Sequence, residues 1–370
     1  MVPALAVAAA LRADGAEVAF IGAGRAEATL VPTAGYELHA ISVEGLSRSN
    51  PLRALRALLR AALAVPRARA LLARLRPDAV MGGGGYVAGP VVLAALSLRI
   101  PVVLTEADSR LGLTNRMLAP FVRRVCLAFP LSAGEADERA PQRRRLGSRA
   151  PRRRRLRRRE RRAGSYRVTG RPIPAPSRDL SGARERLGIG ADETCVLVFG
   201  GSLGARTINR AAAEAFAGRS SIGGGFRVLH IAGSREYAEL AARELSDGYD
   251  LREYLDQEDF ADALAAADLA VSRAGGSVFE IAAHGVPAIL VPYPHAAAGH
   301  QTTNARWMAD AGAAVVIADG ELTAARLARA VAELLADRTG LAMMAAASRG
   351  LARPDAAREV ARELEEVARR

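Results

Sequence analysis

Three glycine clusters are the parts of this sequence best suited to binding an anion. "VMGGGGYVAGP" contains residues 82–85, "VLVFGGSLGARTIN" contains residues 200–204, and "SRAGGSVFE" contains Gly275 and Gly276. Each cluster follows an apolar run of strand length and precedes a helical stretch. Glycine lets the backbone approach a ligand closely, and a helix N-terminus offers unpaired N–H groups to negative charge. The clusters therefore predict a crevice for a phosphate-bearing ligand.

Polar side chains after the third cluster indicate that the ligand also carries hydroxyl groups. Glu280 lies about one helical turn after Gly276, where a carboxylate can accept two ribose hydroxyls; a solvated or capping role is the alternative. The loop "PYPHAAAGHQTTNA" offers imidazole and amide groups that suit sugar hydroxyls, from His295, His300, Gln301 and Asn304. None of the clusters matches G-x-G-x-x-G followed by a ribose-binding acid, so a dinucleotide oxidoreductase fits poorly.

Strands and helices that would position these residues alternate along the chain. In the first half, apolar runs predict strands at 18–21, 38–42, 78–81, 102–104 and 125–127. In the second half, they predict strands at 166–169, 195–199, 227–232, 269–272, 288–291 and 314–317. Helical stretches separate most of them, including 52–75, 206–217, 237–245 and 323–336. We therefore expect an α/β fold with two doubly wound, Rossmann-like domains facing each other across a cleft.

The formal net charge of +13 is confined to one segment. Residues 139–162 contain 14 Arg and one Glu, so the rest of the chain sums to zero. This segment has no apolar periodicity and its like charges repel one another, which predicts a disordered insertion. A stretch decoded out of frame and a segment that contacts anionic lipid are the alternatives. No aromatic residues accompany the charge, so we expect no specific nucleic-acid partner.

The remaining composition is that of a globular protein with 50% apolar residues. The longest apolar stretch, residues 86–98, is too short to span a bilayer. The two cysteines, Cys126 and Cys195, are interpreted as buried thiols, and no metal-ligand spacing is present in the sequence. We therefore expect neither a metal nor a cofactor. The sequence contains no lysine, which excludes a P-loop and a Schiff-base lysine.

The motifs carry a resemblance to a known family. "GGGGYVAGP", "TEADSRLGLTNRMLA", "FGGSLGARTIN" and "SRAGGSVFEIAAHGVPAILVPYPHAAAGHQTTNA" resemble motifs of the MurG family, and the resemblance covers nearly the whole chain except the Arg-rich segment. It implies a GT-B fold and an inverting hexosyltransferase that moves N-acetylglucosamine from UDP-GlcNAc to lipid I. The product would be lipid II, for peptidoglycan synthesis. The resemblance also implies a peripheral enzyme at the cytoplasmic face of the plasma membrane, with an anionic membrane surface as a partner.

The resemblance implies four segments. Residues 1–138 would form the acceptor and membrane-side domain, and residues 139–165 the Arg-rich insertion. Residues 166–352 would bind UDP-GlcNAc, and residues 353–370 would form a helix that packs back on the N-terminal domain.

The donor site implied by the resemblance surrounds the second and third glycine clusters. Ser202 would bind the diphosphate, Glu280 the ribose hydroxyls, and Leu255 would pack near uracil. His300 and Gln301 align with paired glutamines that contact the sugar, the first of them being His in this chain. The implied donor set is completed by Asp108, which stands where the family usually has Asn, and by Gly201, Gly204, Arg273, Gly275, Gly276 and Ser277.

The acceptor diphosphate would face the first glycine cluster, at Gly82, Gly83, Gly84, Gly85 and Tyr86. Glu106 is our candidate for an acid/base group beside this cluster, with a purely structural role as the alternative.

The start of the chain departs from the family. There, a first strand and a glycine-rich loop ending in the base His precede the stretch that "VPALAVAAALRADG" resembles. We therefore expect the chain as written to bind donor but to transfer poorly or not at all. A misassigned start codon is the simplest cause, and upstream in-frame codons should then supply the strand, the loop and the His.

Two further questions stay open at the level of sequence. In the stretch 51–75, leucines at helical spacing with interleaved Arg are compatible either with a membrane-interface helix or with an apolar face packed on the sheet, through Leu52, Leu55, Leu58, Leu59 and Leu63. The alternative functions are a UDP-GlcNAc 2-epimerase-like enzyme, which needs no lipid acceptor, and a donor-binding protein without activity.

Overall fold

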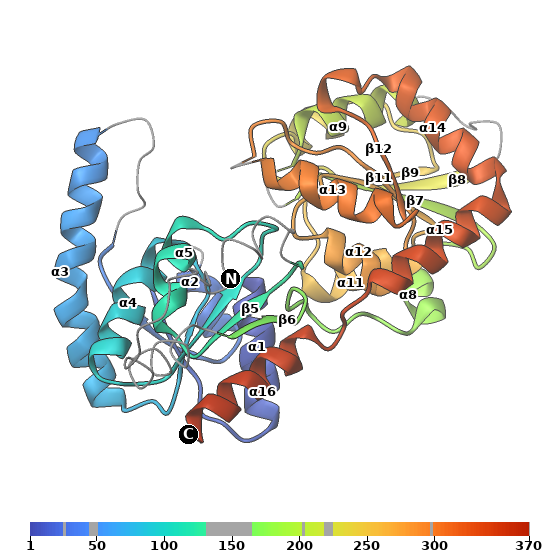
Figure 1. Ribbon diagram of the computed structural model, residues 1–370. Coiled ribbons are helices and arrows are strands. Elements are labelled where there is room, and N and C mark those ends of the chain that lie inside the picture. The colour runs from blue at the N-terminus through green and yellow to red at the C-terminus, as the bar shows by residue number, and fades with distance from the viewer. Residues whose placement is uncertain are drawn as a thin grey trace, which may run out of the picture. The chain divides into compact units, whose positions relative to one another are not determined.

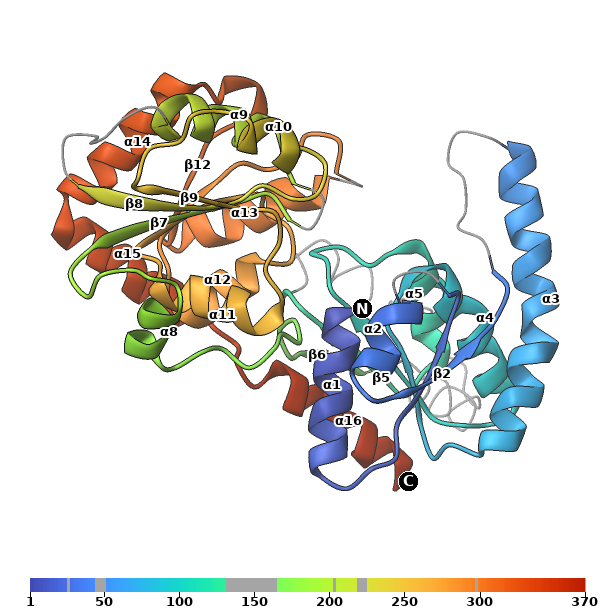
Figure 2. The ribbon, with the colours of Figure 1, turned by 180° about the vertical axis from the view of Figure 1, so that it is seen from behind.

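The structure of this protein is a computed structural model that describes residues 1–24, 27–43, 51–130, 165–201, 204–217, 225–296 and 299–369. The Arg-rich stretch 139–162 lies outside these residues. The chain divides into two compact units, one formed by residues 1–172 with 355–370 and the other by residues 173–354. Each unit contains parallel strands with helices around them, as Figures 1 and 2 show from opposite sides.

The first unit contains a two-stranded and a four-stranded parallel sheet. β1 (Ala19–Gly22) pairs with β2 (Glu37–Ala40). The four-stranded sheet follows chain order, with β3 (Val80–Gly82), β4 (Val102–Glu106), β5 (Arg124–Leu127) and β6 (Ser165–Val168). The segment 166–169 was expected to begin the second domain, but it pairs with β5 through Cys126 and Arg167. The boundary therefore falls between Pro172 and Ile173 instead of after residue 165.

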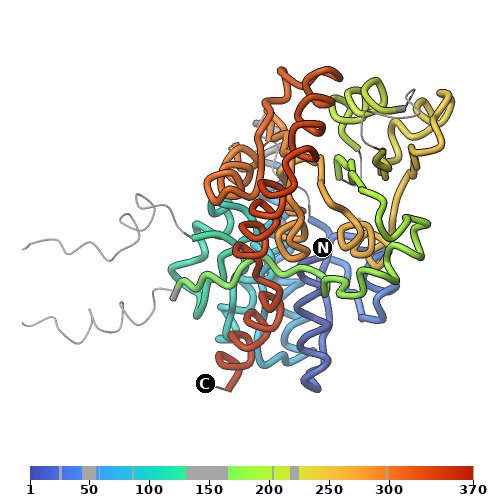
Figure 3. Tube along the Cα trace, turned by 90° about the vertical axis from the view of Figure 1, so that its right-hand side faces the viewer, coloured from blue at the N-terminus to red at the C-terminus, as the bar shows by residue number. Residues whose placement is uncertain are grey.

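Helices cover both faces of the four-stranded sheet. On one face, α1 (Val2–Ala13) and α16 (Ala356–Ala368) share an apolar cluster with β4 and β5, and all three ribbon and tube views place these two helices side by side. Figure 3 shows α1 in blue and α16 in red. Arg124 on β5 forms ion pairs with two residues of α16, Glu363 at 2.7 Å and Glu366 at 3.4 Å. The final helix therefore belongs to the first unit.

The other face is covered by α3 (Pro51–Leu75) and α4 (Gly85–Ser97). The side of α3 that packs against α4 and the core carries small residues, since Ala57, Ala64 and Ala68 are at most 2% exposed. Leu59 and Leu63 are 58% and 67% exposed. The interpretation that these two leucines pack on the sheet is therefore wrong, because the alanines allow a closer helix approach. The side chains of Leu52, Leu55 and Leu58 lie outside the described residues.

The first unit also contains α2 (Glu27–Thr33), α5 (Leu113–Leu118) and a 3₁₀ turn at Ala119–Phe121. α5 packs against α4 and follows β4 through the loop 107–112.

The second unit has one six-stranded parallel sheet in the order β12-β11-β10-β7-β8-β9. Its strands are β7 (Thr194–Phe199), β8 (Phe226–Ile231), β9 (Tyr249–Arg252), β10 (Leu269–Ser272), β11 (Ala288–Leu290) and β12 (Ala314–Val316). The chain runs outward from β7 to β9, then returns to β10 on the other side of β7. The strand order therefore reverses between β7 and β10, which is where open α/β sheets bind ligands.

The second unit's helices form two layers. α9 (Arg206–Ala212), its π-helical continuation (Ala213–Ala217) and α14 (Ala324–Ala336) share a core with alternate residues of the sheet. On the other face, Phe199 meets Phe260 of α11 edge to face, with ring centroids 5.1 Å apart. The remaining helices are α8 (Leu180–Arg186), α10 (Tyr237–Ala241), α11 (Gln257–Ala266), α12 (Val278–His284), α13 (His300–Asp310) and α15 (Arg338–Leu351), with a 3₁₀ turn at Asp319–Glu321.

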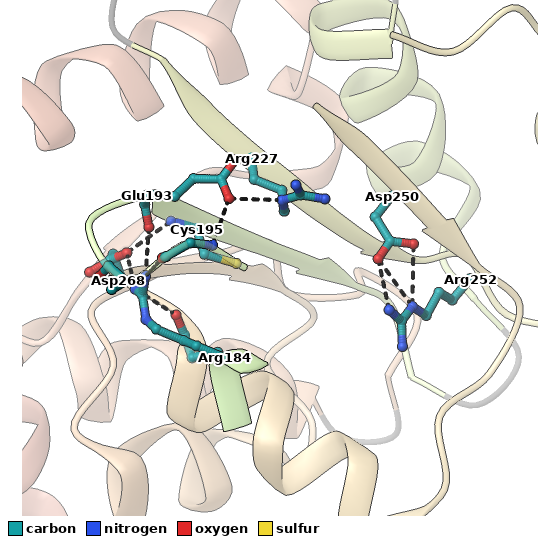
Figure 4. Close-up of polar contacts among 10 residues, drawn as sticks. Arg184, Glu193, Cys195, Arg227, Asp250, Arg252 and Asp268 are labelled. Carbon is teal, nitrogen blue, oxygen red and sulfur yellow. Dashed lines mark hydrogen bonds and ion pairs between the residues drawn. The ribbon is translucent and has the colours of Figure 1, made fainter. Parts of the chain in front are cut away.

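Hydrogen bonds and ion pairs of charged side chains connect the starts of neighbouring strands at the amino edge of this sheet (Figure 4). Arg184 donates to Asp268 at 3.0 Å and to the carbonyl of Glu193 at 2.7 Å, and Asp268 also accepts the backbone N–H of Cys195 at 2.8 Å. Glu193 in turn binds Arg227 at the start of β8, at 3.1 Å. The amino edge is therefore held by contacts within the chain, and the second and third glycine clusters lie at the opposite, carboxyl edge of this sheet.

Candidate active site

The second and third glycine clusters emerge next to each other at the switch point. β7 and β10 are hydrogen-bonded neighbours in which Phe199 lies opposite Ser272. β7 ends at Phe199 and β10 ends at Ser272, and a glycine turn follows each of these strand ends. The two turns predicted to bind phosphate are therefore at adjacent strand ends. Ser202, the predicted diphosphate ligand in the first of them, lies outside the described residues.

The turn after β7 has a backbone that requires glycine. Gly201 has φ +95° and Gly204 has φ +79°, in the left-handed region that other residues rarely adopt. A Cβ at Gly204 would also lie 2.1 Å from the carbonyl oxygen of Ala232. The turn is therefore packed directly against the end of β8, and its position depends on that neighbour.

The turn after β10 is held by α13. Asn304, which is 1% exposed, donates its side-chain N–H to the carbonyl of Ala274 at 3.0 Å. Gln301, one helical turn earlier, accepts the backbone N–H of Tyr293 through its Oε1 at 2.9 Å. Its Nε2 is the atom nearest to a Cβ built on Gly275, at 4.0 Å. The amide of Gln301 is therefore oriented with its N–H donors toward the turn.

Arg273 is buried at the start of this turn and already has protein partners. Its guanidinium forms an ion pair with Asp319, donates to the carbonyl of Val291 at 3.1 Å, and lies 5.4 Å from the ring centroid of Tyr293. These contacts fix the strand end of β11 and the loop that leads to Gln301. Sequence reasoning missed Asp319, because nothing in the local pattern links it to a residue 46 positions earlier.

The other predicted donor residues, apart from Asp108, lie on or directly before helices of the second unit. Ser277 and Glu280 lie at the start and in the first turn of α12, and both are half-buried. Leu255 is 7% exposed and lies directly before Asp256, the N-cap of α11. His300 is half-buried at the first position of α13. All belong to the second unit, whereas Asp108 lies on an exposed loop of the first unit.

The first glycine cluster forms the turn between β3 and α4 in the first unit. Gly84 and Gly85 have φ of +78° and +75°. Gly83 lines a pocket of about 150 Å³ together with Thr105, Glu106 and Arg171. The backbone of Tyr86 lies in α4, and its side chain is outside the described residues.

Glu106, at the end of β4, accepts hydrogen bonds on both carboxylate oxygens. Its Oε2 accepts the N–H of Gly112 at 2.7 Å and the side-chain N–H of Asn115 at 3.0 Å, and its Oε1 accepts the N–H of Asp108 at 3.3 Å. Burial raises the pKa of Glu106 above its ordinary value, while these hydrogen bonds act in the opposite direction. The carboxylate thus organises the loop 107–112 and also lines the pocket.

The two thiols are buried in this fold. Burial raises the pKa of both Cys126 and Cys195 to about 12, so neither is a thiolate at neutral pH. Among the described residues, no group of three His, Cys, Asp or Glu side chains is placed to hold a metal ion.

Two family models match the chain. The N-terminal domain of glycosyltransferase family 28 matches residues 1–127, and the C-terminal domain of that family matches residues 195–360. A protein of Moorella thermoacetica named UDP-N-acetylglucosamine–N-acetylmuramyl-(pentapeptide) pyrophosphoryl-undecaprenol N-acetylglucosamine transferase is 39% identical over 369 residues, covering 96% of this chain and 92% of that protein. A protein of the same name from Rubrobacter xylanophilus is 42% identical over 357 residues, covering 96% of both.

Solved structures agree with these sequence matches. The crystal structure of Acinetobacter baumannii MurG superposes with a TM-score of 0.70 at 28% identity and covers 98% of this chain and 95% of that one. UDP-GlcNAc 2-epimerase from Neisseria meningitidis superposes with a TM-score of 0.63 at 13% identity, covering 99% of this chain and 96% of that one. The epimerase therefore shares the fold alone.

Proposed function

Because this chain belongs to the MurG family of N-acetylglucosamine transferases, we propose which of its residues perform each part of the transfer. The enzyme is a UDP-GlcNAc-dependent hexosyltransferase that acts on lipid I and forms lipid II in peptidoglycan synthesis.

We place the donor in the second unit, at the carboxyl ends of β7 and β10. The observation that carries this proposal is the adjacency of the two glycine turns at the switch point. Their backbone N–H groups, with Ser202, would bind the diphosphate, which leaves as an anion and needs electrostatic stabilisation. Glu280 would accept the ribose hydroxyls, and Leu255 would pack near uracil. Gln301, with its N–H donors directed toward Gly275, would donate to the sugar.

We place the acceptor diphosphate in the first unit, against the turn at 82–86. The pocket beside Gly83 and Glu106 supports this assignment. The three hydrogen bonds on Glu106 favour a positioning role for this carboxylate, which holds Asp108 and the loop 107–112 in place. We therefore propose Glu106 as a positioning residue of the acceptor site.

A lipid-linked acceptor requires contact with a membrane, and we propose that α5 and the 3₁₀ turn after it provide this contact at the cytoplasmic face. Leu113, Met117 and Phe121 repeat at four-residue spacing and are 66%, 65% and 68% exposed. Arg116 and Arg123 are exposed in the same segment and would meet anionic headgroups. The described parts of the chain contain no helix long and apolar enough to cross a membrane.

A transfer assay tests the reaction. Any labelled sugar that passes from UDP-GlcNAc to the lipid fraction is expected to do so only when lipid I is also present, whatever the rate of transfer. Conversion of UDP-GlcNAc to its 2-epimer without lipid would instead identify an epimerase, and donor binding without either product would identify an inactive donor-binding protein.

A further inference from the structure

A chain of buried polar side chains lies beneath the turn that follows β7. His230 on β8 and Asn209 on α9 are both 0% exposed. His230 Nδ1 lies 2.6 Å from the hydroxyl of Tyr249 on β9, and its Nε2 lies 3.1 Å from Asn209 Oδ1. Asn209 Nδ2 donates to the carbonyl of Ala232 and to Glu236 Oε2, both at 2.8 Å. The function described above assigns no role to any of these side chains.

The direction of every hydrogen bond among these buried side chains follows from Asn209. Its Nδ2 gives one hydrogen to each of two acceptors, so its Oδ1 must accept. His230 therefore carries its proton on Nε2, and its Nδ1 accepts the hydroxyl hydrogen of Tyr249. Burial lowers the pKa of His230 to about 4, which keeps the ring neutral with this single proton. The side-chain groups are therefore all satisfied in one arrangement.

This network ends at the glycine turn. The carbonyl of Ala232, which Asn209 binds, is the atom against which Gly204 packs. Glu236, the other acceptor from Asn209, also accepts the Nε–H of Arg206 at 3.0 Å. Arg206 is the first residue of α9 and comes two positions after Gly204. One network therefore holds both the turn and the arginine beside it.

Arg206 is placed to bind a ligand oxygen. Its side chain is 77% exposed, whereas the side chain of Glu236 is 13% exposed. Among the described residues, Glu236 accepts from this guanidinium, and the contact occupies Nε. The two Nη groups thus remain for an anion at the carboxyl end of β7. A guanidinium whose position is fixed by a carboxylate binds phosphate oxygens with little loss of side-chain freedom.

We propose that Arg206 binds the diphosphate of the nucleotide-sugar donor, and that His230 and Asn209 are positioning residues that hold Arg206 and the Gly204 turn for that contact. This inference rests on the proposed donor site. Tyr249 and Glu236 complete the network, the first by donating its hydroxyl hydrogen to Nδ1 of His230 and the second by anchoring the guanidinium.

Calorimetry with UDP and with uridine, on the full chain, separates the diphosphate contact from the rest of the site. Arg206→Gln is expected to weaken UDP binding about 10- to 100-fold, and to leave uridine binding unchanged. Arg227→Gln is the matched control, because Arg227 also pairs with a glutamate but at the amino edge of the sheet. It should bind UDP as the wild type does.

Two substitutions of His230 test the positioning role. His230→Phe removes both ring nitrogens and is expected to weaken UDP binding about 5- to 20-fold, with uridine binding unchanged. His230→Gln keeps an N–H donor for Asn209 and should restore most of the UDP affinity. A purely structural role would lower the melting temperature of His230→Phe but leave its ratio of UDP to uridine affinity unchanged.

The outcomes are distinguishable. If the wild type binds UDP and Arg206→Gln binds it equally well, the inference is wrong and the proposed donor site stands. If UDP affinity is unchanged in His230→Phe, the positioning role is wrong. If the wild type binds no UDP, the donor site and this inference both fail.

Discussion

Phe199 and Ser272 lie opposite each other in adjacent parallel strands, and each is the last strand residue before a glycine turn. The register of this one pair brings together two motifs that are separated by about seventy residues of sequence. It also places them where the strand order of the sheet reverses. The proposed donor site, with the roles of Glu280 and Gln301 in it, depends on this juxtaposition.

The ribose role of Glu280 predicts a loss of donor affinity. Glu280→Ala should weaken UDP-GlcNAc binding by roughly 1.5–3 kcal/mol, because a charged acceptor of ligand hydroxyls is removed. Calorimetry measures this directly. Glu239→Ala, an exposed carboxylate on α10, is the control and should leave affinity unchanged. Normal affinity in Glu280→Ala would refute the ribose role.

The orientation of the Gln301 amide predicts that this residue acts as a donor. In Gln301→Glu the contact to the N–H of Tyr293 is preserved, but the N–H groups directed toward Gly275 are lost and a negative charge is added. UDP-GlcNAc affinity should fall about tenfold or more. Thr302→Glu adds the same charge at the exposed neighbouring position and serves as control. Equal affinities in the two variants would contradict the assigned orientation.

Asn304 should matter for stability as well as for binding. Asn304→Ala leaves the carbonyl of Ala274 without its buried donor, at a position that is 1% exposed. The free energy of unfolding should fall by about 1–3 kcal/mol. Denaturant titration measures the change, with exposed Thr303→Ala as the control on the same helix. A change of less than half a kilocalorie per mole, on the order of an ordinary surface substitution, would show that the bond is dispensable.

The buried His230 predicts a specific pH dependence of stability. Its pKa is lowered from 6.5 to about 4 in the folded state, so the unfolded chain binds its proton first as the pH falls. The contribution of His230 is therefore fully present above pH 6.5 and is lost between pH 6.5 and about pH 4. The loss amounts to about 3 kcal/mol.

The comparison that isolates this effect is between the wild type and His230→Gln. Both free energies of unfolding are measured at pH 7 and pH 4.5, because carboxylates titrate in both proteins and cancel in the difference. The variant should show the shallower decline. Parallel declines would mean that His230 does not stay neutral in the fold.

The proposed membrane contact predicts a difference between two exposed methionines. Met117 and Met343 are 65% and 69% exposed, the first on α5 and the second on α15 of the other unit. Met117→Asp should lower retention on anionic vesicles about tenfold, because it loses apolar burial and adds repulsion. Met343→Asp should bind vesicles as the wild type does. Equal retention of the two variants would exclude α5 as the contact.

Much of the fold could be predicted from local pattern. Every strand predicted from an apolar run contains a strand in the structure, since buried parallel strands have a strong apolar signal. β9 was missed because its sequence is polar, with Asp250 and Arg252 bound to each other at 2.9 Å on an edge strand. The assignment of 166–169 to the second domain was wrong. This segment pairs with β5, and which sheet a strand joins depends on tertiary contacts that the local sequence pattern does not show.

The chemistry of the site was predictable only in part. The glycine turns and the polar loop were visible because their residue types are unusual for their positions. The partners that hold them were not predictable, because Asp319, Ala232 and Glu236 lie in segments that follow other strands and are brought close only by the fold. Asn209 did carry a signal, as a polar residue among the buried positions Ile208 and Ala211 of its helix.

Hydrogen–deuterium exchange of the full chain with UDP-GlcNAc tests the central claim most directly, because it reports where the donor binds. We predict protection of the turns at 200–206 and 273–280 in the second unit, and no protection at 82–86 until a lipid I analogue is added. Protection by UDP-GlcNAc confined to 82–86, or absent from both turns of the second unit, would contradict the account.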